Sequence, residues 1–198
     1  MTGTTEDIDV ARRLAEADRA TFEALFKKHN AAMVKLAQGV VGSRAIAEEI
    51  SQDTWYTVLS RAAIFEGRSS LAGWIFTILM NNARTAAKRN GRTVSFDDGG
   101  EDNSLAAAFD GSGRWKDLPE LWERRTPERI ADERNQLKTV SAAIDQLPAG
   151  QKTVLALRVQ EGLTTAEVAE ALQISEVNVR ILLHRARLAL RSALGPTA

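Results

Sequence analysis

The chain has 198 residues, a formal net charge of zero and no cysteine, and 44% of its residues are hydrophobic. Disulfides and thiolate metal sites are therefore excluded, and the composition fits a reducing cytoplasm. The N-terminus is polar and acidic, and the apolar stretches are interrupted far short of a membrane span, so we expect a soluble cytoplasmic protein without a signal peptide or membrane insertion.

The length allows one large or two small hydrophobic cores, and we expect two. The charge is unevenly distributed: residues 91–128 hold nine acidic and five basic groups, whereas residues 61–92 hold six basic groups and one acidic group. A local basic surface of this kind attracts nucleic acid even when the whole chain is neutral.

Helical periodicity runs through the N-terminal half, and no strand pattern is found anywhere in the sequence. From about Asp18 onward, apolar residues recur at intervals of three and four. Gly42 and Ser43 predict a helix end followed by a new N-cap, and a third helix should start near Ser69 or Ser70 and finish in the basic run NNARTAAKRN.

From Asn90 to Arg125 the periodicity is lost and Gly, Asp and Ser accumulate, which predicts a linker. It contains four aromatic residues, more than a passive tether requires. Helix signals resume at Thr126-Pro127 and break at Leu147-Pro148. A further helix is expected from Gln151 to Glu161, ending at Gly162.

The segment that follows predicts a helix-turn-helix. Thr164 is a good N-cap, and Glu167 three residues later can complete a capping box. Ser175 caps a second helix after a turn too short for anything but a sharp corner. No acidic residue follows Glu176, so the second helix is basic.

This second helix has two distinct faces. Its buried side should consist of Val179, Leu182, Leu183, Ala186 and Leu190. The outward side carries Val177, Arg180, Ile181, His184, Arg185 and Arg191. A solvated basic helix of any bundle could show the same outward face, but the two caps and the short turn favour a helix that enters the DNA major groove.

Three segments, in this order, resemble bacterial extracytoplasmic-function sigma factors, the smallest class of promoter-recognition subunits. The part of the family that grips the polymerase clamp resembles AEEISQDTW, and its minus-ten reader resembles FEGRSSLAGWIFTILMNNA. Its minus-thirty-five reader resembles LPAGQKTVLALRVQEGLTTAEVAEALQISEVNVRILLHRAR. One motif would be suggestive only, whereas three in the family order around a linker are hard to obtain by chance.

The resemblance implies an all-α protein of two small helical domains, without catalysis, cofactor or metal. We expect an N-terminal domain over residues 1–92, a flexible acidic linker over 93–126 and a C-terminal helix-turn-helix domain over 127–198. The implied partners are core RNA polymerase, promoter DNA and an anti-sigma factor. The linker would thread toward the active centre of the polymerase. The polymerase channel is positively charged and should attract the acidic linker.

The sequence and the resemblance together assign three groups of residues. The minus-thirty-five element would be read by Asn178, Arg180, Ile181, His184, Arg185 and Arg187. The minus-ten element would be bound by Arg68, Ser69, Ser70, Asn81, Asn82, Arg84, Lys88 and Arg89. The polymerase would be bound by Glu48, Glu49, Gln52, Asp53 and Trp55. Without the resemblance, those carboxylates would be a solvated helix face, and the Glu-x-x-His pairs of a di-metal site are missing.

The sequence departs from the family pattern in two places, the turn and the reading helix. Gln173 occupies the turn position that is usually glycine, so a residue with a side chain would adopt a left-handed conformation at about 1–2 kcal/mol. Ile181 and Leu182 replace a small polar residue and an arginine, which leaves the promoter preference open. Ile181 points outward and could contact only an apolar group such as a thymine methyl.

Two other functions fit parts of the sequence. A helix-turn-helix repressor or activator would bind duplex DNA by itself, and a helical adaptor would bind only protein. A sigma factor should instead need core polymerase and then support transcription initiation.

Overall fold

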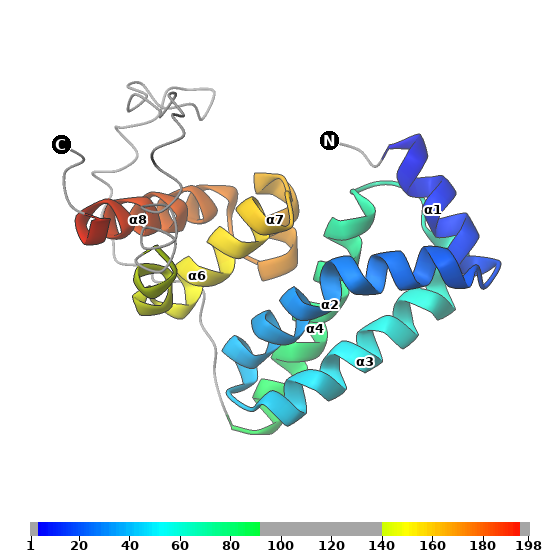
Figure 1. Cartoon of the computed structure of the whole chain (residues 1–198), viewed down its shortest axis with the longest axis horizontal. Coiled ribbons are helices and arrows are strands. Elements are labelled where there is room, and N and C mark those ends of the chain that lie inside the picture. Colours follow the sequence, from blue (N-terminus) through cyan, green and yellow to red (C-terminus); the bar gives the residue numbers. More distant parts are fainter. Residues whose placement is uncertain (1–3, 92–139, 195–198) are drawn as a thin grey trace, which may run out of the picture.

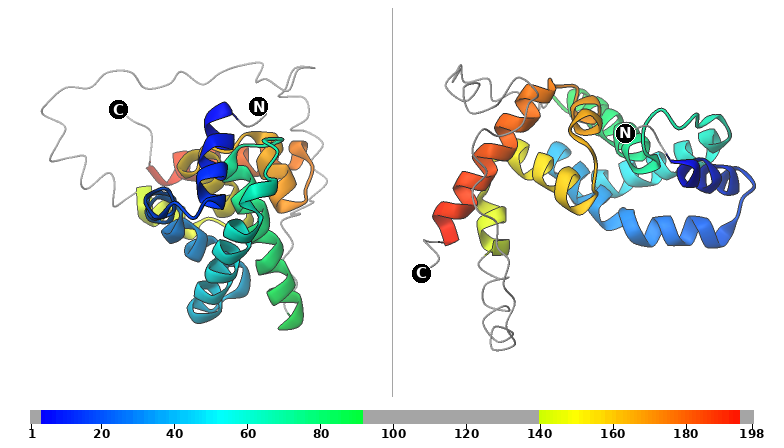
Figure 2. Two further views of the ribbon diagram at one scale, coloured as in Figure 1. Left: turned by 90° about the vertical axis from the view of Figure 1, so that its right-hand side faces the viewer. Right: turned by 90° about the horizontal axis from the view of Figure 1, so that it is seen from above.

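The computed structural model describes residues 4–91 and 140–194, which are helical with short connections and contain no strand. The helices form two groups. In Figure 1, α1 to α4 occupy the right side and α6 to α8 the left side. The right-hand view in Figure 2, from above, shows the two groups next to each other. The predicted linker over 93–126 and the helix signals from Thr126-Pro127 up to residue 139 lie outside the described residues.

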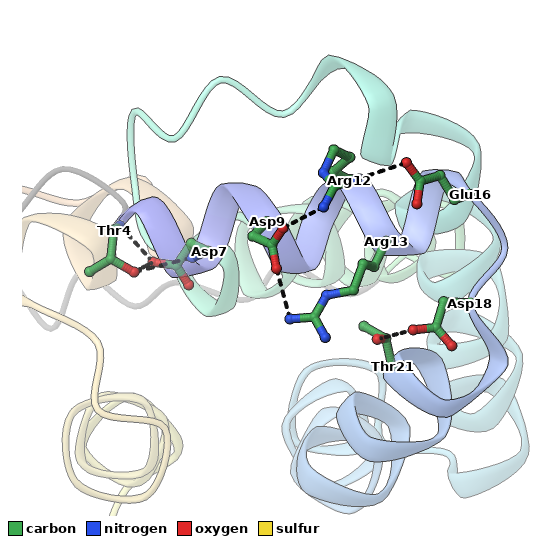
Figure 3. A network of polar contacts seen from close by, with 8 residues as sticks. All are labelled: Thr4, Asp7, Asp9, Arg12, Arg13, Glu16, Asp18 and Thr21. Atoms are coloured by element: carbon green, nitrogen blue, oxygen red, sulfur yellow. Dashed lines mark hydrogen bonds and ion pairs between the residues drawn. The ribbon is translucent and has the colours of Figure 1, made fainter.

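The first helix, α1 (Thr5–Ala15), was not expected from the sequence. Thr4 and Asp7 form a reciprocal capping box at its start. Arg12 then lies 2.6 Å from Asp9 and 3.0 Å from Glu16, and these polar contacts line the helix in Figure 3. Ala11 and Leu14 are the buried residues of the helix. The apolar stripe is therefore short, and charged residues separate its members in the sequence.

The second helix begins and ends where the sequence predicts, and the third begins where the sequence predicts. α2 (Arg19–Val41) has Asp18 as its N-cap and ends at Gly42, which takes the left-handed conformation with φ of 76°. Ser43 then caps α3 (Arg44–Arg61). Glycine adopts the left-handed conformation at little cost in free energy. At this corner that conformation reverses the direction of the chain, so that α3 packs against α2.

α4 follows the short 3-10 helix η1 (Ala62–Ile64) and spans Leu71–Arg89. Ser70 is its N-cap, as predicted, and its hydroxyl accepts from the Gly73 amide at 3.0 Å. Ile75, Phe76 and Leu79 are fully buried and pack this helix against α2 and α3. Lys88 and Arg89 are therefore exposed at the far end of a well-anchored helix.

In the C-terminal group, residues 140–146 are helical and the break at Leu147-Pro148 is as predicted. α6 spans Ala149–Leu155, two residues earlier than the predicted start, and continues into the π-helical turn η4 (Ala156–Gln160). Gly162 follows with φ of 71°. α7 (Thr165–Leu172) and α8 (Glu176–Leu194) then form the predicted helix-turn-helix.

The two groups of helices touch each other. α4 contacts α7, and α2 contacts α6. Buried apolar side chains from both groups form one continuous cluster, from Ala11 near the N-terminus to Leu183 in α8. This differs from the sequence-based expectation of two cores, because contacts between segments far apart in the chain leave no periodic signal.

Candidate promoter and polymerase interfaces

The residues predicted to bind the minus-ten element gather on α4 and on the turn that precedes it. Arg68 is exposed and pairs with Glu66 at 2.5 Å, while Ser69 and Ser70 are half-buried at the start of the helix. Lys88 and Arg89 are exposed at its end, where cations also favour the helix dipole. The predicted set thus runs from one end of α4 to the other.

Asn81 and Arg84 form a pair in the second half of this helix. Asn81 is exposed, and its Oδ1 accepts from Arg84 at 2.7 Å. The Nη1 atom of Arg84 is buried and has no hydrogen-bond partner within the described residues. Burial lowers the pKa of Arg84 from its ordinary value. A buried guanidinium nitrogen without an acceptor is costly, and a phosphate oxygen would satisfy it.

Asn82 occupies a different position from Asn81. It is half-buried, and its amide donates to the hydroxyl of Thr54 on α3 at 3.2 Å. The hydroxyl of Thr54 in turn donates to the Ile50 carbonyl at 2.7 Å. Asn82 therefore links α4 to α3 in this structure, while Asn81 lies on the exposed side.

Glu167 of α7 lies against the start of α4. Its Oε1 accepts from the Ser70 amide at 2.7 Å, while its Oε2 accepts from the Thr164 amide at 2.7 Å to complete the predicted capping box. Burial raises the pKa of Glu167, but the hydrogen bonds from Ser70 and Thr164 outweigh burial and hold this pKa below its ordinary value. One carboxylate thus accepts hydrogen bonds from backbone amides at the N-termini of both α4 and α7.

α8 has the two faces that the sequence predicts. Val179, Leu182, Leu183 and Ala186 are buried, and Leu190 is half-buried. On the other side Val177 is 56% exposed, whereas Ile181, His184 and Arg185 are half-buried. Arg187 is exposed, and Arg180 pairs with Glu176 at 2.9 Å. The Asn178 amide donates to the hydroxyl of Ser175, which caps the helix as predicted.

The electrostatics of His184 favour a neutral ring. Burial lowers the pKa of His184 below its ordinary value, and the positive charge of Arg187 lowers it further. A neutral imidazole has one donor and one acceptor nitrogen, so it can pair with either kind of group on a base edge.

Gln173 takes the left-handed conformation expected from its place in the turn, with φ of 56°. Its side chain forms a hydrogen bond with α4, in which Nε2 donates to Oδ1 of Asn81 at 3.3 Å. The helix-turn-helix therefore reaches α4 at two points, through Glu167 and through Gln173. Sequence reasoning missed both contacts because the partners are more than ninety residues apart.

The predicted polymerase-binding residues lie on α3. Glu48, Glu49, Gln52 and Asp53 are exposed, and Glu48 pairs with Arg44 at 2.8 Å. Trp55 instead points inward, is only 4% exposed and packs its ring against Phe22 and Phe26.

The exposed apolar residues of this face are Tyr56 and Leu59, at 75% and 39% exposure. Sequence reasoning missed Tyr56, although its spacing of three from Asp53 and seven from Glu49 puts it on the same face.

Within the described ranges, 4–91 and 140–194, no group of three or more His, Cys, Asp or Glu residues is placed to hold a metal ion. His29 and Glu161 do approach each other, with Nδ1 and Oε2 at 2.6 Å, and both side chains are buried. This pair joins α2 to the end of η4. Among the same described residues, no helix is both long and apolar enough to span a membrane.

Two family models match the chain in its two helical parts. Sigma-70 region 2 matches residues 25–93, which include α3 and α4, and Sigma-70 region 4 matches residues 137–190, which include the helix-turn-helix. The order of the two regions is the one that the sequence motifs indicate.

Curated relatives share nearly the whole length of the chain. The RNA polymerase sigma-H factor of Pseudomonas aeruginosa is 28% identical over 191 residues, covering 96% of this chain and 95% of the relative. The ECF RNA polymerase sigma factor SigL of Mycobacterium tuberculosis is 28% identical over 185 residues, covering 91% and 92%. SigX of Bacillus subtilis, another ECF sigma factor, is 25% identical over 171 residues, covering 86% and 82%.

Solved structures support the all-α fold. CnrH, in complex with the cytosolic domain of CnrY, matches with a TM-score of 0.53 at 21% identity, over 95% of this chain and 96% of that one. The sigma factor RpoE of Bartonella quintana, in complex with the anti-sigma factor NepR, also matches at 0.53, with 19% identity over 89% and 98%. With both regions present in order and with relatives that match over most of their length, the chain belongs to the sigma-70 family, and two of these relatives are named as ECF RNA polymerase sigma factors.

Proposed function

We propose that this protein binds core RNA polymerase and directs it to specific promoters, acting in the cytoplasm as an initiation factor and not as an enzyme. The observation that carries the proposal is the presence of both sigma-70 regions, in order, in one chain. A regulator that binds DNA through a helix-turn-helix alone would not require sigma-70 region 2.

The minus-ten element is bound by α4. Asn81 presents a carboxamide on the exposed side, and a carboxamide can donate to and accept from a base edge. Lys88 and Arg89 hold phosphates of the separated strand, while Arg68, Ser69 and Ser70 form the adjoining pocket. The buried Nη1 of Arg84 supports a phosphate contact, because it lacks an acceptor among the described residues. Asn82 contributes through its bond to Thr54, which fixes α4 against α3.

The minus-thirty-five element is read by the outward face of α8. Arg185 is the strongest candidate for base recognition, because an arginine can donate two hydrogen bonds to guanine in the major groove. Asn178, Arg180, His184 and Arg187 flank it on the same side of the helix or at its edge. Ile181 is half-buried among them and suits a thymine methyl.

The polymerase is bound by the outer face of α3. Glu49, Gln52 and Asp53, with Glu48 at the edge, offer carboxylate and amide groups to basic residues of the clamp. Tyr56 supplies the exposed aromatic contact, while Trp55 stiffens the helix from behind. An anti-sigma factor is a further expected partner, since the two solved neighbours are each bound to another protein and one of those is named an anti-sigma factor.

Run-off transcription with core polymerase tests the proposed function. The protein should support initiation only together with the polymerase, whereas a conventional regulator would shift duplex DNA by itself and an adaptor would do neither. Absence of specific initiation with active core polymerase would refute the proposal.

The minus-ten assignment has its own test. Asn81→Ala should reduce permanganate-detected promoter opening without weakening polymerase binding. Asn90→Ala is the matched control, because Asn90 is also exposed and lies at the end of the same helix. Normal opening with Asn81→Ala would contradict the role of this residue.

A further inference from the structure

The exposed face of α2 is basic, and it belongs to neither of the proposed DNA-reading helices. Residues 24–47 contain four lysines and arginines and no acidic residue. Three of the four are lysines on α2, and at about 3.6 residues per turn they share one side of the helix with small or neutral side chains. This side, the lysine face, consists of the exposed residues Lys27, Lys28, Ala31, Lys35, Gln38 and Gly39.

The lysines of this face have no partner of opposite charge. Neither Lys27, Lys28 nor Lys35 forms an ion pair with any residue in the ranges 4–91 and 140–194. Arg19 and Arg44, in contrast, each pair with a glutamate four residues further along the same helix. The lysine face therefore presents a positive charge that the described part of the chain does not compensate.

Gly39 independently indicates that a partner approaches this face. It lies in the interior of α2, where glycine is less stable than alanine. Packing within the protein does not explain it, because a Cβ atom at this position would meet nothing within 4 Å among the described residues. Gly42, which ends the same helix, has a different reason to be glycine, because its conformation is left-handed. An interior glycine that faces open space fits a close contact made from outside the protein.

The composition of the lysine face favours nucleic acid over protein as the partner. The face contains no large exposed apolar residue, and lysine is depleted at protein–protein interfaces. A lysine ammonium group binds phosphate as a point charge and does not require the planar geometry of an arginine contact. A basic polymerase surface that attracts the acidic outer face of α3 would also repel these lysines.

The position of α2 connects this face with the proposed minus-ten site. α2 packs against both α3 and α4. Figure 1 and the left-hand view in Figure 2 show the end of α2, the start of α3 and the end of α4 together, toward the lower edge of the N-terminal group. The end of α4 carries Lys88 and Arg89, which belong to the proposed minus-ten set. Promoter DNA bound at this end of α4 would thus lie next to the end of α2.

We propose that the lysine face of α2 binds the phosphate backbone of the duplex DNA that adjoins the minus-ten element, without reading its sequence. This inference rests on the proposed binding of the minus-ten element by α4. Phosphate contacts fix the orientation of a duplex and carry no base information. The lysine face therefore adds affinity, while α4 and α8 supply the sequence preference. Gly39 lets the DNA backbone approach α2 closely.

The salt dependence of DNA binding tests the charges. Core polymerase with the full-length protein titrates a labelled duplex fragment that carries a promoter on which the parent protein initiates in the run-off assay. The variant Lys27→Gln, Lys28→Gln, Lys35→Gln loses up to three phosphate contacts. The slope of the logarithm of the binding constant against the logarithm of the salt concentration should therefore become shallower by about 2–3, with affinity near 0.1 M salt at least about tenfold weaker. Discrimination between promoter and scrambled duplex should not change.

Arg19→Gln is the matched control for this variant. Arg19 is also an exposed cation on α2, but it lies outside the lysine face and pairs with Glu23. Its removal should leave the salt slope of the parent holoenzyme unchanged.

Gly39→Gln tests the close approach. Glutamine favours a helix interior more than glycine does and meets no crowding here, so the urea midpoint of the free protein should rise. The same side chain should obstruct the DNA backbone and weaken duplex binding by the holoenzyme about eightfold, the loss expected for one phosphate contact near 0.1 M salt. A purely structural role for Gly39 would not combine higher stability with weaker binding.

Three outcomes would overturn the proposal. If the triple lysine variant kept the salt slope of the parent, the lysine face would be in contact with solvent only. If this variant instead lost affinity for core polymerase in fluorescence anisotropy without DNA, the face would bind protein. If Gly39→Gln bound the duplex as tightly as the parent, no DNA backbone would approach Gly39. A failure of the proposed function is distinguishable from all three, because the parent protein itself would then not initiate transcription in the run-off assay.

Discussion

Asn30 should be a main support of the polymerase-binding helix. Its Oδ1 accepts two hydrogen bonds, from the Ser51 hydroxyl at 2.8 Å and from the indole Nε1 of Trp55 at 3.1 Å. Both donors lie on α3, with Ser51 and Trp55 1% and 4% exposed, so no water can replace the acceptor easily. The substitution Asn30→Ala leaves the two donors without a partner.

The cost follows from these two donors. An unsatisfied buried donor costs about 1–3 kcal/mol, and the hydroxyl of Ser51 can rotate toward another acceptor, so we expect a loss of about 2–4 kcal/mol. With a urea slope of about 2 kcal/mol per molar, in the middle of the range for small proteins, the unfolding midpoint should fall by about 1–2 M. Polymerase affinity should fall as well, because Glu49, Gln52 and Asp53 project from the other side of the same helix.

A double-mutant cycle isolates the hydrogen bond. Trp55→Phe removes the indole donor, so it should cost less in the Asn30→Ala background than in the parent protein, with a coupling energy of about 1–3 kcal/mol. Urea unfolding followed by circular dichroism measures all four proteins. Gln38→Ala, an exposed amide on the same α2, is the control. If Asn30→Ala were no more destabilising than this control, or if the coupling were zero, the assigned role of Asn30 would be wrong.

Three further outcomes are expected. Arg185→Ala should reduce discrimination at one base pair of the upstream promoter element by about 1–3 kcal/mol in competition binding by the holoenzyme, and an equal loss on scrambled DNA would mean a phosphate contact instead. Because the pKa of Glu167 is lowered in the folded protein, its carboxylate should stabilise the fold at pH values above the unfolded-state pKa of about 4.3. This stabilisation should be lost as the pH falls through the lower folded-state pKa, and acid unfolding of Glu167→Gln should lack this pH-dependent loss. His184 should titrate below its usual value of about 6.5 by nuclear magnetic resonance, and Arg187→Ala should raise the midpoint only in part because burial remains; an unchanged midpoint would remove Arg187 as a cause.

The sequence predicted those features that depend on neighbours in the chain. Ser70, Thr164 and Ser175 are N-caps in the structure, because capping needs only a side-chain oxygen within three residues. The same rule applied to Thr4 and Asp7 would have revealed α1, which its high charge content concealed. The π-helical turn after Leu155 had no such signal, so a single continuous helix was predicted there.

The residues of the candidate site could be predicted from the sequence, but their contacts with other helices could not. Periodicity placed Glu49 and Asp53 on one face of α3 and grouped Trp55 with the apolar residues of the helix, yet it did not identify Phe22 and Phe26 as the partners of Trp55. A tryptophan at the border of a helix face can turn either way, and packing against another helix decides. The contacts of Glu167 and Gln173 with α4 depend on the same kind of long-range packing, so they had to come from the structure.

The separation of α4 and α7 along the chain also sets an order of events during synthesis. α1 to α4 pack largely on their neighbours in sequence, and such local contacts form fast. α4 is complete at Arg89, whereas α7 begins only at Thr165. At a ribosomal rate of about 5–20 residues per second, the nascent chain exposes a folded α4 for roughly 4–15 s before α7 is made. During that interval α7 cannot yet cover α4, so the growing polypeptide presents a surface of α4 that the finished chain packs against its helix-turn-helix.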